Sequence, residues 1–169
     1  KMAGIYIHVP FCRQACRYCD FYFTVRLKYR DEYVAALLKE LVLRKKLIGS
    51  AAVDTIYFGG GTPSVLSLRH LESIFNQLSV AFNISKNAEI TLEANPDDLS
   101  PTYLNGLRSL GFNRLSIGVQ SFFQDDLSLM GRSHTEMQAS ESIKNATKAG
   151  FSNINMDLIY GVAGLTMKK

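Results

Sequence analysis

The sequence lacks the features that would mark a membrane or secreted protein. None of its apolar runs is long enough to span a bilayer, and no signal-peptide pattern is present. We therefore expect a cytoplasmic protein. The formal charge of +4 over 169 residues is modest, and its cations gather on one predicted helix and at the end of the chain. A solvated face explains them better than a nucleic-acid or lipid surface, so we expect no nucleic-acid partner.

Cysteine is absent outside one short stretch, which holds Cys12, Cys16 and Cys19. Three thiols cannot form a disulfide framework without leaving one unpaired, and cytosolic proteins rarely keep disulfides. Thiolates at such tight spacing are typical ligands of zinc or of an iron–sulfur cluster. A structural zinc site needs a fourth ligand, which His8 on the preceding predicted strand would have to supply. Three cysteines alone suit a cubane cluster that leaves one iron open to a substrate or cofactor.

The remainder of the chain alternates predicted strands with predicted helices, an order that predicts parallel β/α units. Strands are expected at residues 5–10, 53–58, 88–94, 114–121 and 153–160. Helices are expected at residues 30–48, 68–82, 101–110 and 135–149, with a short helical piece at 125–130.

The two faces of these strands differ in polarity. In the strands expected at residues 5–10, 88–94, 114–121 and 153–160, one face is aliphatic, whereas the other carries polar residues such as Glu93, Gln120 and Asp157. A doubly wound sheet between two helix layers should be apolar on both faces. Polar groups that recur on one face suit the ligand-lined interior of a barrel. We therefore predict an α/β fold in the form of a partial (β/α) TIM-like barrel.

A second motif with chemical potential ends the strand expected at residues 53–58. The run Gly59-Gly60-Gly61-Thr62-Pro63 lets the backbone approach a ligand closely, and Thr62 adds a hydroxyl group. No Gly-Lys-Ser/Thr follows, which excludes a P-loop. The residues alone leave a tight turn and a ligand-binding loop as equal interpretations.

The spacing Cys-x-x-x-Cys-x-aromatic-Cys after a strand resembles the radical S-adenosylmethionine (SAM) superfamily. The segments Tyr6-x-His8-x-Pro10-Phe11-Cys12 and Tyr18-Cys19-Asp20-Phe21 are similar to the family of oxygen-independent coproporphyrinogen III oxidase and the heme chaperone. The resemblance covers nearly the whole chain and implies a [4Fe-4S] cluster on the three cysteines, with SAM bound at its open iron. In catalytic members, one electron from the reduced cluster cleaves SAM to yield a 5′-deoxyadenosyl radical.

The resemblance also implies an incomplete domain. The superfamily's usual core has six β/α units, followed in this family by a C-terminal domain, whereas only five strands are predicted here. We therefore expect residues 1–169 to form one radical SAM core domain, truncated after about the fifth strand, as an N-terminal fragment or a truncated gene product.

Nine further residues match family positions that contact SAM. The glycine run matches the segment that holds the amino group of SAM. Tyr6 matches an aromatic position near the methionine end of SAM, and Tyr18 matches one near the adenine. His8 and His134 belong to family motifs without an assigned role, no catalytic acid or base is assigned, and His70 is expected to be exposed on a helix. The nine are Tyr6, Tyr18, Gly60, Gly61, Thr62, Glu93, Gln120, Arg132 and Asp157.

The sequence departs from the family pattern at two positions, one that bears on the branch of the family and one that bears on the loop after the fifth predicted strand. Phe21 stands where the oxidase branch has a fourth cysteine, which favours the heme chaperone branch. That branch implies heme binding and handover to membrane respiratory proteins, with SAM and the cluster in a structural or regulatory role. The alternatives are the oxidase, which converts coproporphyrinogen III to protoporphyrinogen IX, and a zinc-binding structural domain. Ala163 replaces the usual proline in the segment 161–164, where we expect a looser loop.

Overall fold

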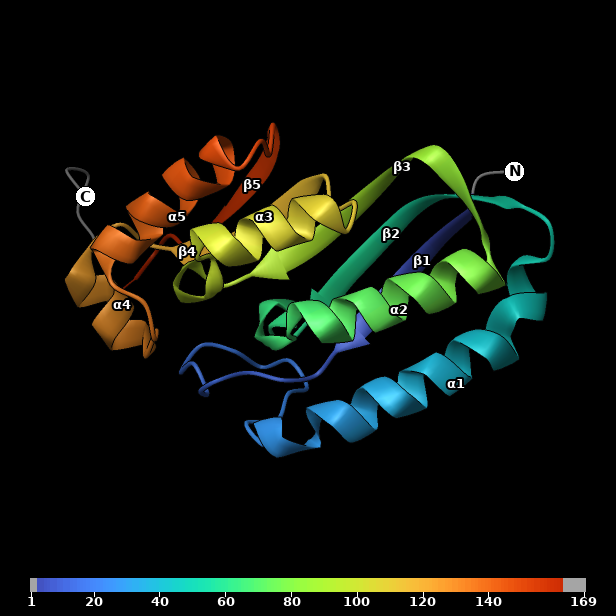
Figure 1. Cartoon of the computed structure of the whole chain (residues 1–169). Helices are drawn as coiled ribbons and strands as arrows, with labels where there is room; N and C mark the ends of the chain where they lie inside the picture. The colour runs from blue at the N-terminus through green and yellow to red at the C-terminus, as the bar shows by residue number, and fades with distance from the viewer. Residues whose placement is uncertain (1–2, 163–169) are drawn as a thin grey trace.

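The computed structural model describes residues 3–162, in which strands and helices alternate in the predicted order (Figure 1). The strands are β1 (Ala3–Val9), β2 (Ala52–Gly60), β3 (Asn83–Ala94), β4 (Arg114–Gln120) and β5 (Asn153–Leu158). The α-helices are α1 (Arg30–Ile48), α2 (Leu68–Ala81), α3 (Pro101–Ser109), α4 (Gln124–Met130) and α5 (Glu136–Lys148). Three short 3-10 helices are η1 (Leu27–Tyr29), η2 (Pro63–Val65) and η3 (Pro96–Asp98). Ala163 and Gly164, where a looser loop is expected, lie outside the described residues.

The strands form one parallel sheet whose spatial order, β1-β2-β3-β4-β5, is the same as their order in the chain. A doubly wound sheet reverses its strand order at a switch point. In the part of the chain that the structure describes, each strand simply adds to the one before it, as in a (β/α) barrel. The prediction of an α/β partial TIM-like barrel is confirmed.

Local sequence signals mark where helices α2, α3 and α5 begin. The hydroxyl oxygen of Ser67 accepts a hydrogen bond from the backbone N–H of His70, and that of Thr135 accepts one from Gln138. Ser100 accepts a bond from the third residue of α3, which has proline at its first position. Each cap satisfies a backbone N–H that has no partner within the helix.

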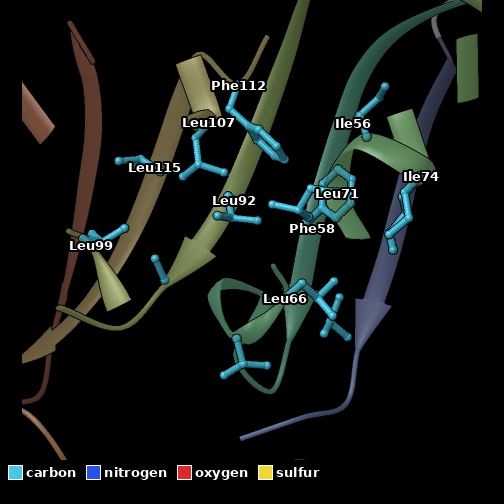
Figure 2. Packing of buried hydrophobic residues seen from close by; sticks show 14 of the residues in the cluster. Ile56, Phe58, Leu66, Leu71, Ile74, Leu92, Leu99, Leu107, Phe112 and Leu115 are labelled. Atoms are coloured by element: carbon cyan, nitrogen blue, oxygen red, sulfur yellow. The ribbon is translucent and has the colours of Figure 1, made fainter. Parts of the chain in front are cut away.

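The hydrophobic core lies between the sheet and helices α1, α2, α3 and α5. Figure 2 shows aliphatic and aromatic side chains from the strands meeting those of the helices in one layer. Phe58 of β2 lies at its centre, with ring centroids 5.9 Å from Phe75 and 5.3 Å from Phe112. The core buries the predicted aliphatic face of β1, β3 and β4, which leaves their polar face toward the other side.

The structure corrects several details of the prediction. Strand β3 begins at Asn83 rather than at residue 88, because Ser85 donates a 2.5 Å hydrogen bond to Asp54 and extends the pairing with β2. The helical spacing of Tyr33, Val34, Leu37, Leu38, Leu41 and Val42 predicts a buried stripe on α1, but Val42 is 55% exposed. His70 was expected to be exposed, but its side chain is only 17% exposed and lies 2.6 Å from Asp31.

No described helix combines the length and the apolar composition that crossing a bilayer would require.

Candidate functional site

A cavity of about 420 Å³ lies at the carboxyl ends of the strands, on the polar face of the sheet. This is the end of a (β/α) barrel where ligand sites are built. All twelve residues predicted for the site line this one cavity. They are Tyr6, Cys12, Cys16, Tyr18, Cys19, Gly60, Gly61, Thr62, Glu93, Gln120, Arg132 and Asp157.

The three cysteines lie in the loop between β1 and α1, which Figure 1 shows passing between the start of α1 and helix α4. All three are free thiols of intermediate burial. The base of the loop is pinned by two backbone hydrogen bonds, from Cys12 N to Thr24 O at 3.0 Å and from Thr24 N to Pro10 O at 2.7 Å. The loop therefore leaves and re-enters the barrel at one fixed point.

A buried carboxylate anchors the loop to the end of β3. The guanidinium group of Arg13 donates to one oxygen of Asp98 from Nε at 2.8 Å and from Nη2 at 2.6 Å. Ser64 donates to the other oxygen at 2.7 Å. The Asp98 side chain is only 2% exposed, so these bonds replace the water that its charge would otherwise need. The carboxylate of Asp98 raises the pKa of Arg13.

Helix α4 provides a third anchor through the carbonyl groups at its carboxyl end. The backbone N–H of Arg17 donates to Met130 O at 3.0 Å, and its guanidinium group donates to Leu129 O at 3.3 Å. The side chain of Gln14 donates to Gly131 O. A cation at this end of a helix also complements the helix dipole.

Two of the thiols have hydrogen-bond donors that suit a thiolate. Thr62 Oγ1 donates to Cys12 Sγ at 3.4 Å, and Arg132 Nη1 donates to Cys16 Sγ at 3.5 Å. Burial raises the pKa of Cys12, and the Thr62 hydroxyl opposes that shift. Three unpaired thiols on one cavity wall, with donors aimed at two of them, fit the thiolate ligand set of an iron–sulfur cluster.

Within residues 3–162, no three His, Cys, Asp or Glu side chains, the three cysteines included, lie close enough together to hold a single metal ion, so this finding does not separate zinc from a cluster. His8, the expected fourth ligand of a zinc site, lies in the same cavity with Nδ1 3.4 Å from the hydroxyl of Tyr6.

The glycine run brings the end of β2 directly against the cysteine loop. A Cβ atom on Gly61 would lie 2.8 Å from Phe11 O and 3.0 Å from Cys12 Sγ, and Gly61 N donates to Val9 O at 2.8 Å. Gly60 has a φ of +116°, where side chains are strongly disfavoured. Of the two interpretations left open by the sequence, this contact with the loop supports a ligand-binding segment over a mere turn.

Glu93 at the end of β3 is held through both of its carboxylate oxygens. Tyr57 donates to Oε1 at 2.7 Å, and the backbone N–H of Gly60 donates to Oε2 at 3.1 Å. Each carboxylate oxygen can accept about two hydrogen bonds. Acceptor capacity therefore remains on the side of Glu93 that lines the cavity.

Arg132 connects the cysteine loop to two strand ends. Its Nη2 donates to Asn95 Oδ1 and to Gly118 O, both at 2.8 Å. Its Nη1 also donates to the hydroxyl of Tyr18 at 3.4 Å. Burial raises the pKa of Tyr18 to about 12, although Arg132 opposes this, so the hydroxyl stays protonated near neutral pH.

Gln120 and Asp157 complete the wall of the cavity on the side of β4 and β5. Gln120 is the non-glycine residue with positive φ, +66°, among residues 3–162, and its carbonyl accepts a bond from Ile159 N at 2.9 Å. A carboxylate oxygen of Asp157 accepts from Asn155 at 2.7 Å, and the other accepts from Ser116 at 3.3 Å. Non-glycine residues in left-handed geometry cluster at functional sites.

Several lining residues escaped the sequence analysis as site residues. Asn95 directly follows the strand that carries Glu93, and this position is the signal that could have identified it. His8 and Phe21 lie in the family motifs, although neither was predicted as a SAM contact. The remaining residues combine common residue types with positions that only the folded chain brings to the cavity. The set is His8, Gln14, Phe21, Tyr22, Phe23, Ala94, Asn95, Ser116, Gly118 and Ser133.

A parallel barrel with a three-cysteine loop at its carboxyl face defines a class of cluster-binding SAM proteins. Residues 6–169 match the family described as the radical SAM superfamily, and the chain belongs to that superfamily. Membership implies a [4Fe-4S] cluster and SAM as cofactors.

Among characterised proteins, the chain is similar to heme chaperones and to an oxidase. It is 41% identical to the heme chaperone HemW of Bacillus subtilis over 99% of this chain and 45% of that protein. It is 36% identical to HemW of Escherichia coli over 98% of this chain and 44% of that protein. The oxygen-independent coproporphyrinogen III oxidase of Synechocystis is 35% identical over 94% of this chain and 35% of that protein. The chain thus spans less than half the length of these relatives.

Two solved structures share the fold. Coproporphyrinogen III oxidase from Escherichia coli, described as a radical SAM enzyme, superposes with a TM-score of 0.88 at 34% identity, over 95% of this chain and 37% of that one. The Elp3 protein of Methanocaldococcus infernus gives a TM-score of 0.63 at 16% identity, over 99% of this chain and 40% of that one, which is a likeness of fold alone.

Proposed function

We propose that residues 1–169 form one radical SAM core domain, and that the protein acts in the cytoplasm as a heme chaperone. In this proposal Cys12, Cys16 and Cys19 hold the [4Fe-4S] cluster, whose open iron takes the amine and carboxylate of SAM. The protein binds heme and hands it to membrane respiratory proteins, while the cluster and SAM have a structural or regulatory role. Support comes from the shared cavity of all twelve predicted residues.

Each part of the SAM molecule has a proposed partner in the cavity. Gly60, Gly61 and Thr62 accommodate its amino group, and Glu93 accepts hydrogen bonds from the ribose hydroxyls. Tyr6 lies near the methionine end and Tyr18 near the adenine. Gln120, Arg132 and Asp157 add polar contacts from the ends of the later strands. The cluster, when bound, supplies one electron to SAM in those family members that catalyse a reaction.

The observation that carries the choice of branch is the residue two positions after the last cysteine of the loop. Phe21 replaces the fourth cysteine of the oxidase pattern, is 76% exposed, and lines the cavity. Heme chaperones also match this chain at 35–41% identity over nearly its whole length.

The second candidate is the oxidase, which converts coproporphyrinogen III to protoporphyrinogen IX by oxidative decarboxylation. The TM-score of 0.88 with the Escherichia coli oxidase favours it. A fold is shared by both branches, however, so this likeness cannot choose between them.

The experiment begins with anaerobic reconstitution by iron and sulfide, followed by EPR of the reduced protein with and without SAM. A cubane signal that changes on addition of SAM supports the cluster and the cavity site. Heme titration followed in the Soret region then tests the chaperone, and coproporphyrinogen turnover tests the oxidase. Zinc-loaded, iron-free protein would refute both and favour a structural zinc domain, and a Cys16→Ala variant serves as the control that should lose the cluster.

A further inference from the structure

Beneath the wall of the SAM cavity lies a tyrosine that is absent from the cavity lining. Tyr57 belongs to β2, two residues before the glycine run, and its side chain points to the polar face of the sheet, as does that of its partner Thr91 on β3. Any effect that it has on a ligand must therefore pass through the residues that it contacts.

The first contact is the hydrogen bond from Tyr57 to Glu93 Oε1 at 2.7 Å. Glu93 has several rotatable bonds, and the Gly60 N–H alone would fix only its other oxygen. With both oxygens engaged, the plane of the carboxylate is fixed and its free lone pairs face the cavity. Burial and Glu93 together raise the pKa of Tyr57 to about 12, so the phenol remains a proton donor across the physiological range.

The second contact is a ring stack with Tyr6, which lines the cavity. The two ring centroids are 5.9 Å apart and the planes are inclined by 20°. Gly59 makes room for this pair, because a Cβ atom there would lie 2.8 Å from Tyr57 Cε1 and 2.9 Å from Tyr6 Cε2. Tyr6 is 58% exposed, so this stack is a major support for its ring.

We infer that Tyr57 is a positioning residue for SAM, because it fixes the carboxylate of Glu93 and supports the ring of Tyr6. This inference rests on the proposed SAM site. The hydroxyl group acts on Glu93 and the ring acts on Tyr6, so the two roles can be separated by substitution.

The test is Tyr57→Phe in the anaerobically reconstituted protein, with the SAM dissociation constant as readout. The ring is kept, so only the bond to Glu93 is lost, and we expect affinity to fall about tenfold. Iron content and thermal midpoint should stay close to those of the wild type. Tyr103→Phe is the matched control, because the Tyr103 hydroxyl donates at 2.9 Å to Leu66 O, away from the cavity. That variant should bind SAM as the wild type does.

A double-mutant cycle with Glu93→Gln tests whether Tyr57 acts through Glu93. We expect Tyr57→Phe to weaken binding much less in the Glu93→Gln background. A second measurement does not depend on SAM. The pKa of the Tyr57 phenol, followed by 13C NMR, should be lower in the Glu93→Gln variant than in the wild type, because the negative charge of Glu93 is removed.

The outcomes separate this inference from the proposed function. If the wild type binds SAM and Tyr57→Phe binds it equally well, or if the two substitutions are additive, the positioning role is refuted while the SAM site stands. If the wild type binds no SAM, the proposed function fails and the inference fails with it.

Discussion

Replacing Asp98 by alanine should loosen the cysteine loop from the barrel and speed the loss of the cluster. Asp98 accepts two bonds from Arg13, which lies between the first two cysteines, and one from Ser64. Hydrogen bonds to a charged group contribute about 1.5–3 kcal/mol. The Arg13 side chain is 48% exposed, so water replaces part of what is lost and the expected cost is about 1–2 kcal/mol. That cost corresponds to a roughly 5- to 30-fold shift toward the open loop.

The assay is the rate of iron release to a chelator under anaerobic conditions, together with the free energy of unfolding. Glu40→Ala is the control, because it breaks a 2.5 Å ion pair with Arg44 in which both side chains are more than half exposed. Such a pair contributes less than about 0.5 kcal/mol. Equal iron release from the Asp98→Ala variant and the wild type would refute the view that this buried carboxylate holds the loop.

Two further predictions concern pH and the glycine run. Burial and the Arg132 charge lower the pKa of His134 to about 4, against the opposing effects of Asp97 and a backbone bond. As the pH falls, His134 is protonated in the unfolded chain before it is protonated in the folded one. The free energy of unfolding should therefore fall by about 3 kcal/mol from pH 6.5 to pH 4. His134→Gln should remove that slope in urea titrations, and an unchanged slope would contradict the assignment. Gly61→Ala places a Cβ atom 3.0 Å from Cys12 Sγ, so we expect iron incorporation to fall severalfold while far-UV circular dichroism stays unchanged. Full incorporation would show that the loop can move aside.

Much of the fold could be predicted because the sequence repeats one physical pattern. Alternation of aliphatic and polar residues in the strands separated the face under the helices from the face toward the cavity. The burial of Leu92, Ile117 and Val119 confirms this separation. Met156 and Leu158 of β5 follow the same alternation but are 44% and 56% exposed, because in residues 3–162 no helix after β5 covers them.

Other features depend on contacts between distant residues and could not be predicted. The early start of β3 depends on a side-chain bond between Ser85 and Asp54, which no local pattern reveals. Val42 follows the helical spacing of the apolar stripe on α1, yet it is 55% exposed while Val34 and Leu41 are buried, so the spacing alone does not define the edge of the buried face. The left-handed φ of Gln120 arises where the register between β4 and β5 shifts.

The candidate site also has a part that could be predicted from the sequence and a part that could not. Twelve of its lining residues could be anticipated because parallel strands bring their ends to one place and because the motifs resemble a known family. The supporting contacts could not, since Arg13 and Asp98 are 85 residues apart in the chain. Each is an ordinary surface residue type whose partner appears only after folding.

The anchors of the cysteine loop also impose an order on biosynthesis. The thiols leave the ribosome first, but Asp98 follows 85 residues after Arg13, and Leu129 follows 112 residues after Arg17. At translation rates of about 5–20 residues per second, the last anchor appears roughly 6–22 seconds after the loop that it holds. During that interval the nascent chain carries three thiols without their final scaffold. A cluster inserted during translation would therefore meet a loop whose anchoring contacts are not yet formed, and the speed of synthesis would set how long that state lasts.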